Sequence, residues 1–317
     1  MKKSLLKVIS IICVLSLLSA FAACGGKTEV TDAEAVTEAE TTKIAEETKE
    51  TETASPLEDE TEAVTETAEE TTEETTEAEK KVPETKEEIL AAYTEIMNLT
   101  KEKKPAFTKA EWQDLPDGDG NRSIVKHSGI LPVPKLIEAA LNVVNNNYVV
   151  TEEKAKAEPE HYDKGTDMYR FPVYDTPKGC MLTDVSAIKS ASAEQLDNGN
   201  IKLVITLKDE KNPEPAEKGA TTAPSNTGKM FSPLSKKKQI DPELQKGFVK
   251  AVVKDAVYDL IYTNCRAELI YNPETSEVVS LKQYTSTIIN GTGKLVGCDV
   301  DIMQVVNDTL EAWDFKY

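Results

Sequence analysis

The sequence predicts an α+β domain built on a curved antiparallel sheet of about five long strands, with two or three helices packed on one face. Three observations indicate this fold class. Apolar residues first recur at helical spacing, they alternate with a period of two after residue 180, and turn motifs join successive alternating runs. The second face of such a sheet can meet water, which suits the polar half of each alternating run.

Three segments show a helical pattern. In the first, Thr85 can cap the helix and Glu88 can complete a capping box. Its apolar face consists of Ile89, Leu90, Tyr93, Ile96 and Met97. A second helix is expected from Pro134, and its apolar face consists of Leu136, Ile137, Ala140, Leu141 and Val144. A third is expected to start with Asp241 as N-cap and Pro242 at its first position. It carries Leu244, Phe248 and Val252.

The strands are expected as hairpins. Residues 181–196 and 200–210 flank an Asp-Asn-Gly-Asn turn, and Asn-Gly between two such runs is a strong hairpin signal because both turn residues need positive φ. Residues 265–272 and 277–289 form a second hairpin around a Pro-Glu-Thr turn. The run 298–317 is predicted to be a terminal strand. Between the hairpins lies a long loop rich in Pro, Gly, Ser and Lys.

The chain begins with the pattern of an export signal, predicted to cover residues 1–23. A positive segment, an apolar run and a stretch of small residues follow one another: Lys2, Lys3 and Lys7, then 8–18, then 19–23. Residues 21–24, Phe-Ala-Ala-Cys, resemble the lipobox of bacterial lipoproteins. That resemblance implies that Cys24 is lipidated and anchors the mature chain to the outer face of the cell membrane, because two or more acyl chains give stable anchoring. The alternative is an ordinary cleaved signal with a chance cysteine.

Residues 24–82 are expected to form a disordered acidic tether that starts at the lipidated cysteine. From residue 27 to 82 the chain contains 18 Glu and 2 Asp against 5 Lys and no aromatic residue, so it cannot bury enough apolar surface to offset its ordering entropy. A flexible chain of this length spans roughly 40 Å, and more when like charges repel. The alternative role is a tail that binds cations or a partner. Residues 83–317 are expected to form a single extracytoplasmic domain.

Few residues of the domain suggest catalysis or metal binding. The two histidines, His127 and His161, lack a metal-ligand spacing, and phosphate-loop, nucleophile-elbow and dinucleotide-binding patterns are absent from the sequence. A calcium-like loop that starts at Asp117 has Arg122 in place of the required glycine and Ser128 in place of the required glutamate. The Lys-rich run in the long loop is too short to imply nucleic-acid binding. We therefore expect no metal, no cofactor, no nucleic-acid partner and no catalytic residue.

One loop gathers aromatic residues around an arginine. They are Tyr162, Tyr169, Arg170, Phe171 and Tyr174. Such a group can line a ligand or sugar site, or it can pin a long loop to the sheet. Besides Cys24, the mature chain contains Cys180, Cys265 and Cys298. A disulfide between two of these three suits an extracytoplasmic compartment, whereas buried free thiols pack as small apolar residues.

Five segments of the domain carry a family resemblance. In chain order they are KKPAFTKAEW, PKGCMLTDVSAIKSAS, NGNIKLVITLKDEKNPEP, MFSPLSKKK and YNPETSEVVSLKQY. Together they resemble a group of secreted lipoproteins from Gram-positive, Firmicutes-type bacteria, for which no activity is established and which therefore brings no catalytic residue. The hairpin units are also similar to those of LolA-like and LppX-like lipoproteins, whose curved sheets hold lipids against a concave face. A shared fold does not fix a function.

The expected function is that of a membrane-anchored surface lipoprotein that binds a ligand or a surface protein without catalysis. A lipidic or other apolar ligand requires a cavity between helices and sheet, expected to be lined by Tyr93, Leu141, Val204 and Trp313. The first alternative is a structural or interaction protein without a small-molecule ligand, which predicts a solid core and an exposed apolar patch above about 400 Å². An enzyme comes third, and it requires two convergent acids in a polar cleft or a thiol beside a histidine.

Overall fold

The computed structural model describes residues 81–116, 122–127, 150–295 and 298–317. Several predictions lie outside these residues. They concern the signal segment, Cys24, almost all of the tether, the helix expected from Pro134 and the start of the calcium-like loop at Asp117. The structural statements that follow refer to the described part of the chain.

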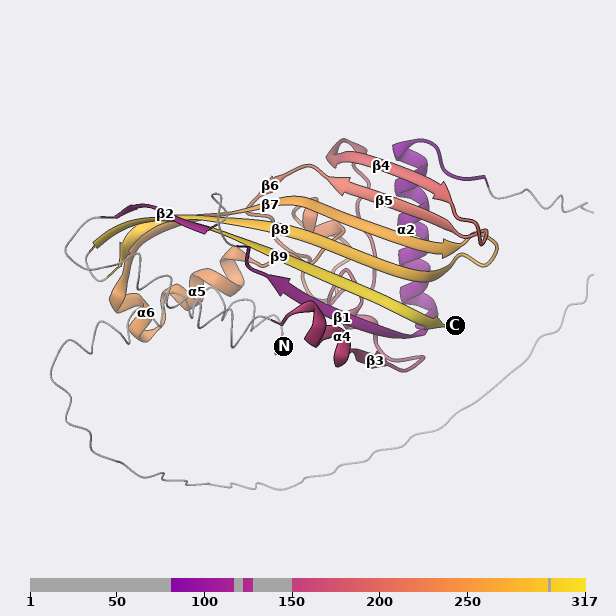
Figure 1. Ribbon diagram of the computed structural model, residues 1–317, viewed down its shortest axis with the longest axis horizontal. Helices are drawn as coiled ribbons and strands as arrows, with labels where there is room; N and C mark the ends of the chain where they lie inside the picture. Colours follow the sequence, from indigo (N-terminus) through magenta and orange to yellow (C-terminus); the bar gives the residue numbers. More distant parts are fainter. Residues whose placement is uncertain (1–80, 117–121, 128–149, 296–297) are drawn as a thin grey trace, which may run out of the picture. The chain divides into compact units, whose positions relative to one another are not determined.

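The described residues form one open antiparallel sheet of nine strands (Figure 1). The strands are β1 (Ala106–Asp114), β2 (Arg122–His127), β3 (Glu160–Tyr162), β4 (Ile188–Gln195), β5 (Ile201–Leu207), β6 (Glu210–Lys211), β7 (Val253–Asn272), β8 (Glu277–Leu295) and β9 (Cys298–Lys316). Their order is β3-β1-β9-β8-β7-β5-β4, with β2 paired to β9 and β6 paired to β7. The α+β prediction is confirmed, with more strands than the five expected because β1, β2, β3 and β6 add to the hairpins.

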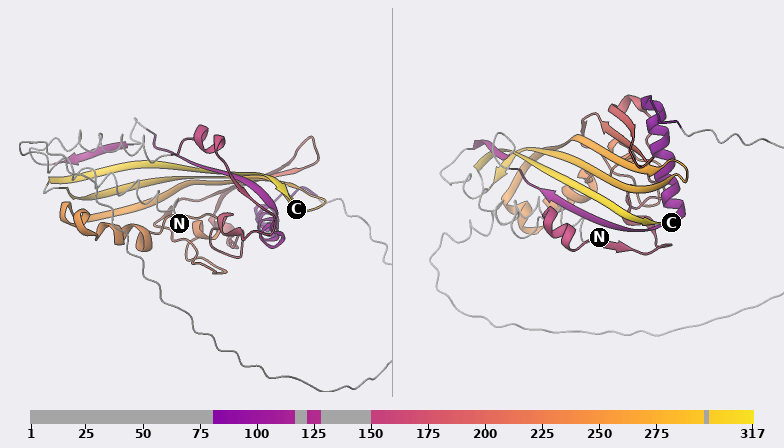
Figure 2. Two further views of the ribbon diagram at one scale, coloured as in Figure 1. Left: turned by 90° about the horizontal axis from the view of Figure 1, so that it is seen from below. Right: turned by 45° about the vertical axis from the view of Figure 1, so that its right-hand side comes forward.

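Helices lie on both faces of this sheet (Figure 2). The helices are α2 (Lys86–Lys103), α4 (Glu152–Ala157), α5 (Asp241–Leu244) and α6 (Gly247–Val252). We call the face covered by α2, α5 and α6 the inner face. The short α4 lies on the opposite, outer face, where Ala155 packs against Ala110 and Trp112 of β1.

Helix α2 forms as the sequence predicts. The Thr85 side chain accepts a hydrogen bond from the Glu88 backbone N–H, and the Glu88 carboxylate accepts one from the Thr85 N–H, which completes the capping box. The five apolar residues expected on its buried face are all buried. Together with the inward residues of β5, β7 and β8 they form the main core, which includes Leu203, Leu269 and Leu281.

Both hairpins are confirmed. Strands β4 and β5 flank the first turn, in which Gly199 takes a φ of 82° while Asn198 does not take a positive φ. The connection is therefore longer than a two-residue Asn-Gly turn, and the Leu196 N–H donates to the Asn200 carbonyl across it. The burial of β5 alternates at every residue, as a period of two requires. The terminal strand is also confirmed, as β9.

The third helix differs from the prediction. A short π-helical turn (Lys236–Ile240) precedes α5, and Ser235, not Asp241, caps it by accepting a hydrogen bond from the Lys238 N–H. Asp241 instead accepts a hydrogen bond from the Tyr258 hydroxyl at 2.6 Å. The helix is then broken before α6, which starts at Gly247 with a φ of 38°. The Asp241 side chain, which could cap a helix, thus makes a tertiary contact instead.

Candidate functional site

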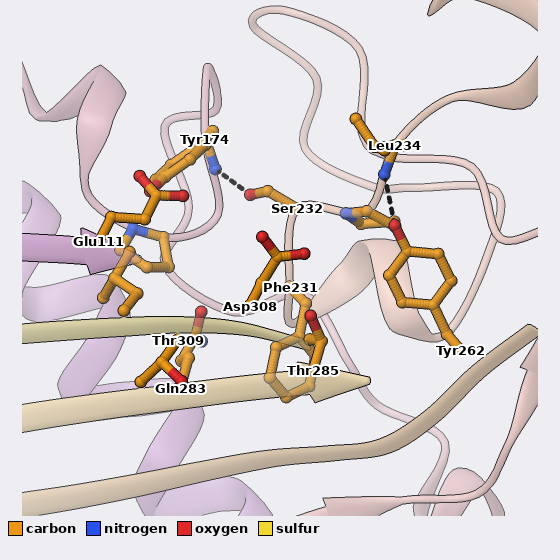
Figure 3. A pocket seen from close by; sticks show the side chains of 13 residues that line it. Glu111, Tyr174, Phe231, Ser232, Leu234, Tyr262, Gln283, Thr285, Asp308 and Thr309 are labelled. Carbon is orange, nitrogen blue, oxygen red and sulfur yellow. Dashed lines mark hydrogen bonds between the residues drawn. The ribbon is translucent and has the colours of Figure 1, made fainter. Parts of the chain in front are cut away.

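A polar hollow lies on the inner face, between the sheet and two loops (Figure 3). Its volume is about 50 Å³. The lining comes from β1, β7, β8 and β9 and from the loops at 172–174 and 231–234: Glu111, Pro172, Tyr174, Phe231, Ser232, Pro233, Leu234, Tyr262, Gln283, Thr285, Asp308, Thr309 and Leu310. This lining contains two carboxylates and no lysine or arginine.

The pairing of β1 with β9 positions the two carboxylates. Glu111 lies opposite Leu310, and Asp308 lies opposite Gln113, two residues further along β1. Alternate residues of a strand share a face, so Glu111 and Asp308 become diagonal neighbours on the inner face. The Gln113 amide donates a hydrogen bond of 2.7 Å to an Asp308 oxygen, which orients that carboxylate.

A buried lysine stands behind Glu111. The side chain of Lys109 is 1% exposed, and its Nζ lies 3.7 Å from Glu111 and 3.5 Å from Glu160. The ammonium also donates to the Tyr174 hydroxyl at 3.3 Å, and that hydroxyl donates to Glu111 at 3.1 Å. The charges of this cluster are therefore paired and hydrogen-bonded, as a buried ion requires. Burial, and then the Glu111 charge, raise the pKa of Tyr174 well above its ordinary value, so this residue stays a neutral phenol.

Hydrogen bonds from backbone to side chain hold the two loops over the sheet. The Tyr174 N–H donates to the Ser232 hydroxyl at 2.9 Å, and the Leu234 N–H donates to the Tyr262 hydroxyl at 2.8 Å (Figure 3). Beneath them, the Gln283 amide donates to the Met230 carbonyl at 3.1 Å. The hollow is therefore a preformed feature whose rim is tied to strands β7 and β8.

The structure places one of the five predicted aromatic-loop residues, Tyr174, at this hollow. The ring of Tyr162 stacks on Phe107 with centroids 4.6 Å apart, and Phe171 is fully buried against Phe107. Tyr169 is 43% exposed and has Lys218 over its ring, while the Arg170 carbonyl accepts a hydrogen bond from Lys109. Tyr162, Phe171 and Tyr174 therefore help to attach the loop to the domain, and Tyr174 does so while lining the hollow.

Sequence reasoning missed the two carboxylates. Lys109 and Glu111 alternate with Ala110 and Trp112, and the charges at these two successive inward positions hide the strand pattern. The available signal was the pair of opposite charges two residues apart in an otherwise apolar run, because such charges share a face of a strand and can pair there. Asp308 carried no comparable signal.

The cavity expected for an apolar ligand does not form from the residues proposed for it. Tyr93 is fully buried in the main core. Val204 lies between the buried inward residues of β5, on the outer face, and Trp313 packs with Ala110 and Trp112 on that same face. The remaining residue, Leu141, lies outside the described residues. Strand alternation accounts for this correction, because it places Val204 and Trp313 on the outer face, away from Tyr93 on the inner face.

The three domain cysteines are free thiols in the structure, and all are buried. The Thr94 hydroxyl donates to the Cys180 sulfur at 3.3 Å, and burial raises the pKa of that thiol. Burial, with the charges of Asp209 and Glu210, raises the pKa of Cys265 to about 12. His161 is exposed at strand β3 and hydrogen-bonds through Nδ1 to the Thr108 hydroxyl, so it does not share the buried surroundings of Cys180.

Among the described residues there is no cluster of three histidine, cysteine or acidic side chains with the geometry of a metal site. Within the same ranges, no helix has both the length and the apolar character needed to cross a bilayer. Comparison with family models, with curated proteins and with solved structures found no match.

Proposed function

We propose that the chain is a lipid-anchored extracytoplasmic binding module, without catalytic activity, whose hollow receives one small cationic group of its ligand. The anchor is the lipobox-like segment that ends at Cys24, with the acidic tether as a spacer. The observation that carries the binding role is the lining of the hollow, where Glu111 and Asp308 lie on one wall without a lysine or arginine. A primary amine or a guanidinium matches such a lining in charge and hydrogen bonding.

The size of the hollow supports a head group as the bound part. A buried water needs at least about 10–15 Å³ of such volume, so about 50 Å³ accepts a few non-hydrogen atoms. Sites that enclose a whole drug-sized molecule are several times larger, at roughly 300–1,000 Å³. The rest of the ligand therefore lies outside the hollow, as a lysine or arginine side chain of a surface protein or an amine-bearing polymer does. Tyr93, Val204 and Trp313 do not line a common cavity, so they give no support to an apolar ligand.

The test uses the full-length chain, purified in detergent and labelled with ¹⁵N. Propylammonium and ethylguanidinium are titrated as probes, with propanol as the neutral control. We expect millimolar binding, with amide shifts at Ser232, Thr285 and Asp308, for the cations and not for propanol. Asp308→Asn keeps an acceptor for Gln113 and removes the charge, so it should weaken binding about tenfold.

The matched control is Glu268→Gln, which removes a carboxylate from the outer face, where Glu268 pairs with Lys202 and Arg266. It should bind both cations as the unmodified chain does. Equal binding of propanol, or the same affinity in Asp308→Asn, would exclude the hollow as a cation site. Glu111 is not used for this test, because its removal would take away one of the two carboxylates that pair with the buried Lys109.

A further inference from the structure

The sheet ends at an open edge formed by β4. Strand β4 pairs with β5 on one side, and no described strand pairs with its other side (Figure 1). In an antiparallel pair every second residue directs its N–H and C=O away from the neighbouring strand. The outer side of β4 therefore presents backbone donors and acceptors in the spacing that another extended chain can use.

Most of this edge lacks the devices that usually protect an edge strand. At its first residues the Lys86 ammonium donates to the carbonyls of Ile188 and Lys189, and the register shifts between Ile188 and Ser190. From there to Glu194 the strand runs Ser-Ala-Ser-Ala-Glu, with no proline, no lysine and no second register shift. Natural proteins use those features to prevent strand addition, so their absence leaves residues 190–195 open to it.

A row of alternating charges crosses the outer face and ends at this edge. Glu194 of β4 lies 3.5 Å from Lys202 of β5, and Lys202 lies 3.6 Å from Glu268 of β7. Glu268 is paired in register with Lys282 of β8, whose ammonium lies 2.7 Å from Glu311 of β9. The sign of the side-chain charge thus alternates from each strand of this row to the next. Glu194, with its side chain 63% exposed, is the last member and carries a negative charge.

We propose that β4 binds an extended segment of another protein by strand addition, and that this segment places a lysine or arginine opposite Glu194. The backbone edge supplies affinity, as in other cases of β-augmentation, and the charge row supplies register. On the inner side of β4, the small side chains of Ala191 and Ala193 pack against the main core. This proposal does not depend on the hollow.

The charge pattern favours a different protein over a second copy of this chain. In a two-fold symmetric antiparallel pair, side chains keep their face, so each residue lies opposite one an even number of positions away or opposite itself. Glu194 would then lie opposite the second copy's Ser190, Ser192 or Glu194. None of these is basic, and Lys189, the lysine of β4, lies at the register shift before residue 190, where its carbonyl accepts a hydrogen bond from Lys86. A strand from another protein with a basic residue opposite Glu194 continues the alternation of charge across the sheet, whereas a second copy of β4 does not.

The experiment measures binding of a fluorescent peptide of alternating threonine and lysine to the full-length chain in detergent. A second peptide, with glutamate in place of lysine, is the charge control. Deuterium exchange by mass spectrometry follows the amides of residues 190–195. We expect the lysine peptide to bind better and to slow exchange in that segment. Glu194→Gln should weaken binding about threefold, as for an exposed ion pair, and Glu194→Lys should reverse the preference.

Two controls separate strand addition from general attraction to an acidic protein. Glu153→Gln removes an exposed charge on α4, near the opposite edge of the sheet, and should leave binding unchanged. In an extended peptide the threonine N–H groups point to one edge and the lysine N–H groups to the other. N-methylation of only one residue type therefore blocks only one edge, and binding should be lost only when the blocked edge is the one that faces β4. Equal binding of both, no slowing of exchange at 190–195, or a dimer formed through β4 would overturn the proposal.

Discussion

Two lysines among the residues that the structure describes are buried, and they are accommodated differently. Lys109 lies between two carboxylates and a phenol. Lys101 of α2 is 4% exposed and donates to two backbone carbonyls, at 2.6 Å to Val173 and 2.8 Å to Thr176. Carbonyl groups do not compensate the charge of an ammonium as carboxylates do. Burial therefore lowers the pKa of Lys101 from 10.5 to about 7, against smaller opposing effects of Asp175 and Asp167.

This pKa makes stability depend on pH in a defined window. Between about pH 7 and 10 the unfolded chain holds a proton on Lys101 that the folded chain has lost, so the free energy of unfolding rises with pH. The contribution is at most about 1.4 kcal/mol per pH unit. Urea denaturation at pH 7, 8 and 9 should show this rise in the unmodified chain and not in Lys101→Met.

The comparison isolates Lys101 from other titrating groups. Lys164→Met, at an exposed loop position, should keep the pH slope of the unmodified chain. Lys101→Met is also expected to be less stable at pH 7, because two carbonyls lose a donor, and only the difference in slope tests the pKa. An unchanged slope in Lys101→Met would show that Lys101 does not titrate in this range.

At the scale of elements, α2 and the segment after the aromatic loop approach so closely that a glycine is required. A Cβ placed on Gly179 would overlap the backbone carbonyl of Met97. The contact is held by Asn98, whose side-chain oxygen accepts hydrogen bonds from the N–H groups of Gly179 and Cys180 at 2.8 and 3.1 Å. The helix thereby fixes the chain that leads into β4.

Substitution of this glycine should cost stability through overpacking. Gly179→Ala is expected to lower the free energy of unfolding by about 1–3 kcal/mol, measured by urea denaturation. Gly291 of β8 provides the control, since a Cβ there meets Tyr258 at 3.4 Å and Ile302 at 3.5 Å, which is ordinary contact. Gly291→Ala should change stability by less than about 0.5 kcal/mol. Equal effects of the two substitutions would contradict the close approach at Gly179.

The elements differ in how well the sequence predicts them. Strand β5 and helix α2 are read correctly because burial on one face imposes an uninterrupted period on their residues. Strand β1 has Lys109 and Glu111 at inward positions. Because these two residues are charged and pair with each other, the sequence of β1 shows no apolar alternation there. The residues of the hollow also differ in how well the sequence predicts them. Tyr174 is recognisable from its aromatic neighbours in the sequence, whereas Glu111 and Asp308 come together only through the pairing of β1 with β9.

At the scale of the whole molecule, the proposed lipid anchor can be tested by fractionation. In a Gram-positive host the full-length chain should be found in the membrane fraction and carry the mass of a lipid on its N-terminus. Cys24→Ser should move the protein to the medium, because in the proposed anchor this one side chain carries the lipid. Cys180→Ser changes a cysteine of the domain and should leave the protein in the membrane fraction. Retention of Cys24→Ser in the membrane would exclude lipidation as the anchor.

The sheet joins the beginning of the domain to its end. Strand β1 pairs along its length with β9, so that Ala106 meets Lys316. Contacts between residues so far apart in sequence form late, because the intervening chain must be closed into a loop first. A chain that emerges from a secretion channel with its N-terminus first cannot complete this sheet until its last residues have arrived. In the proposed export, the pairing of β1 with β9 would therefore form only after β9 has left the channel, whereas the β4–β5 and β7–β8 hairpins need no residue of β9.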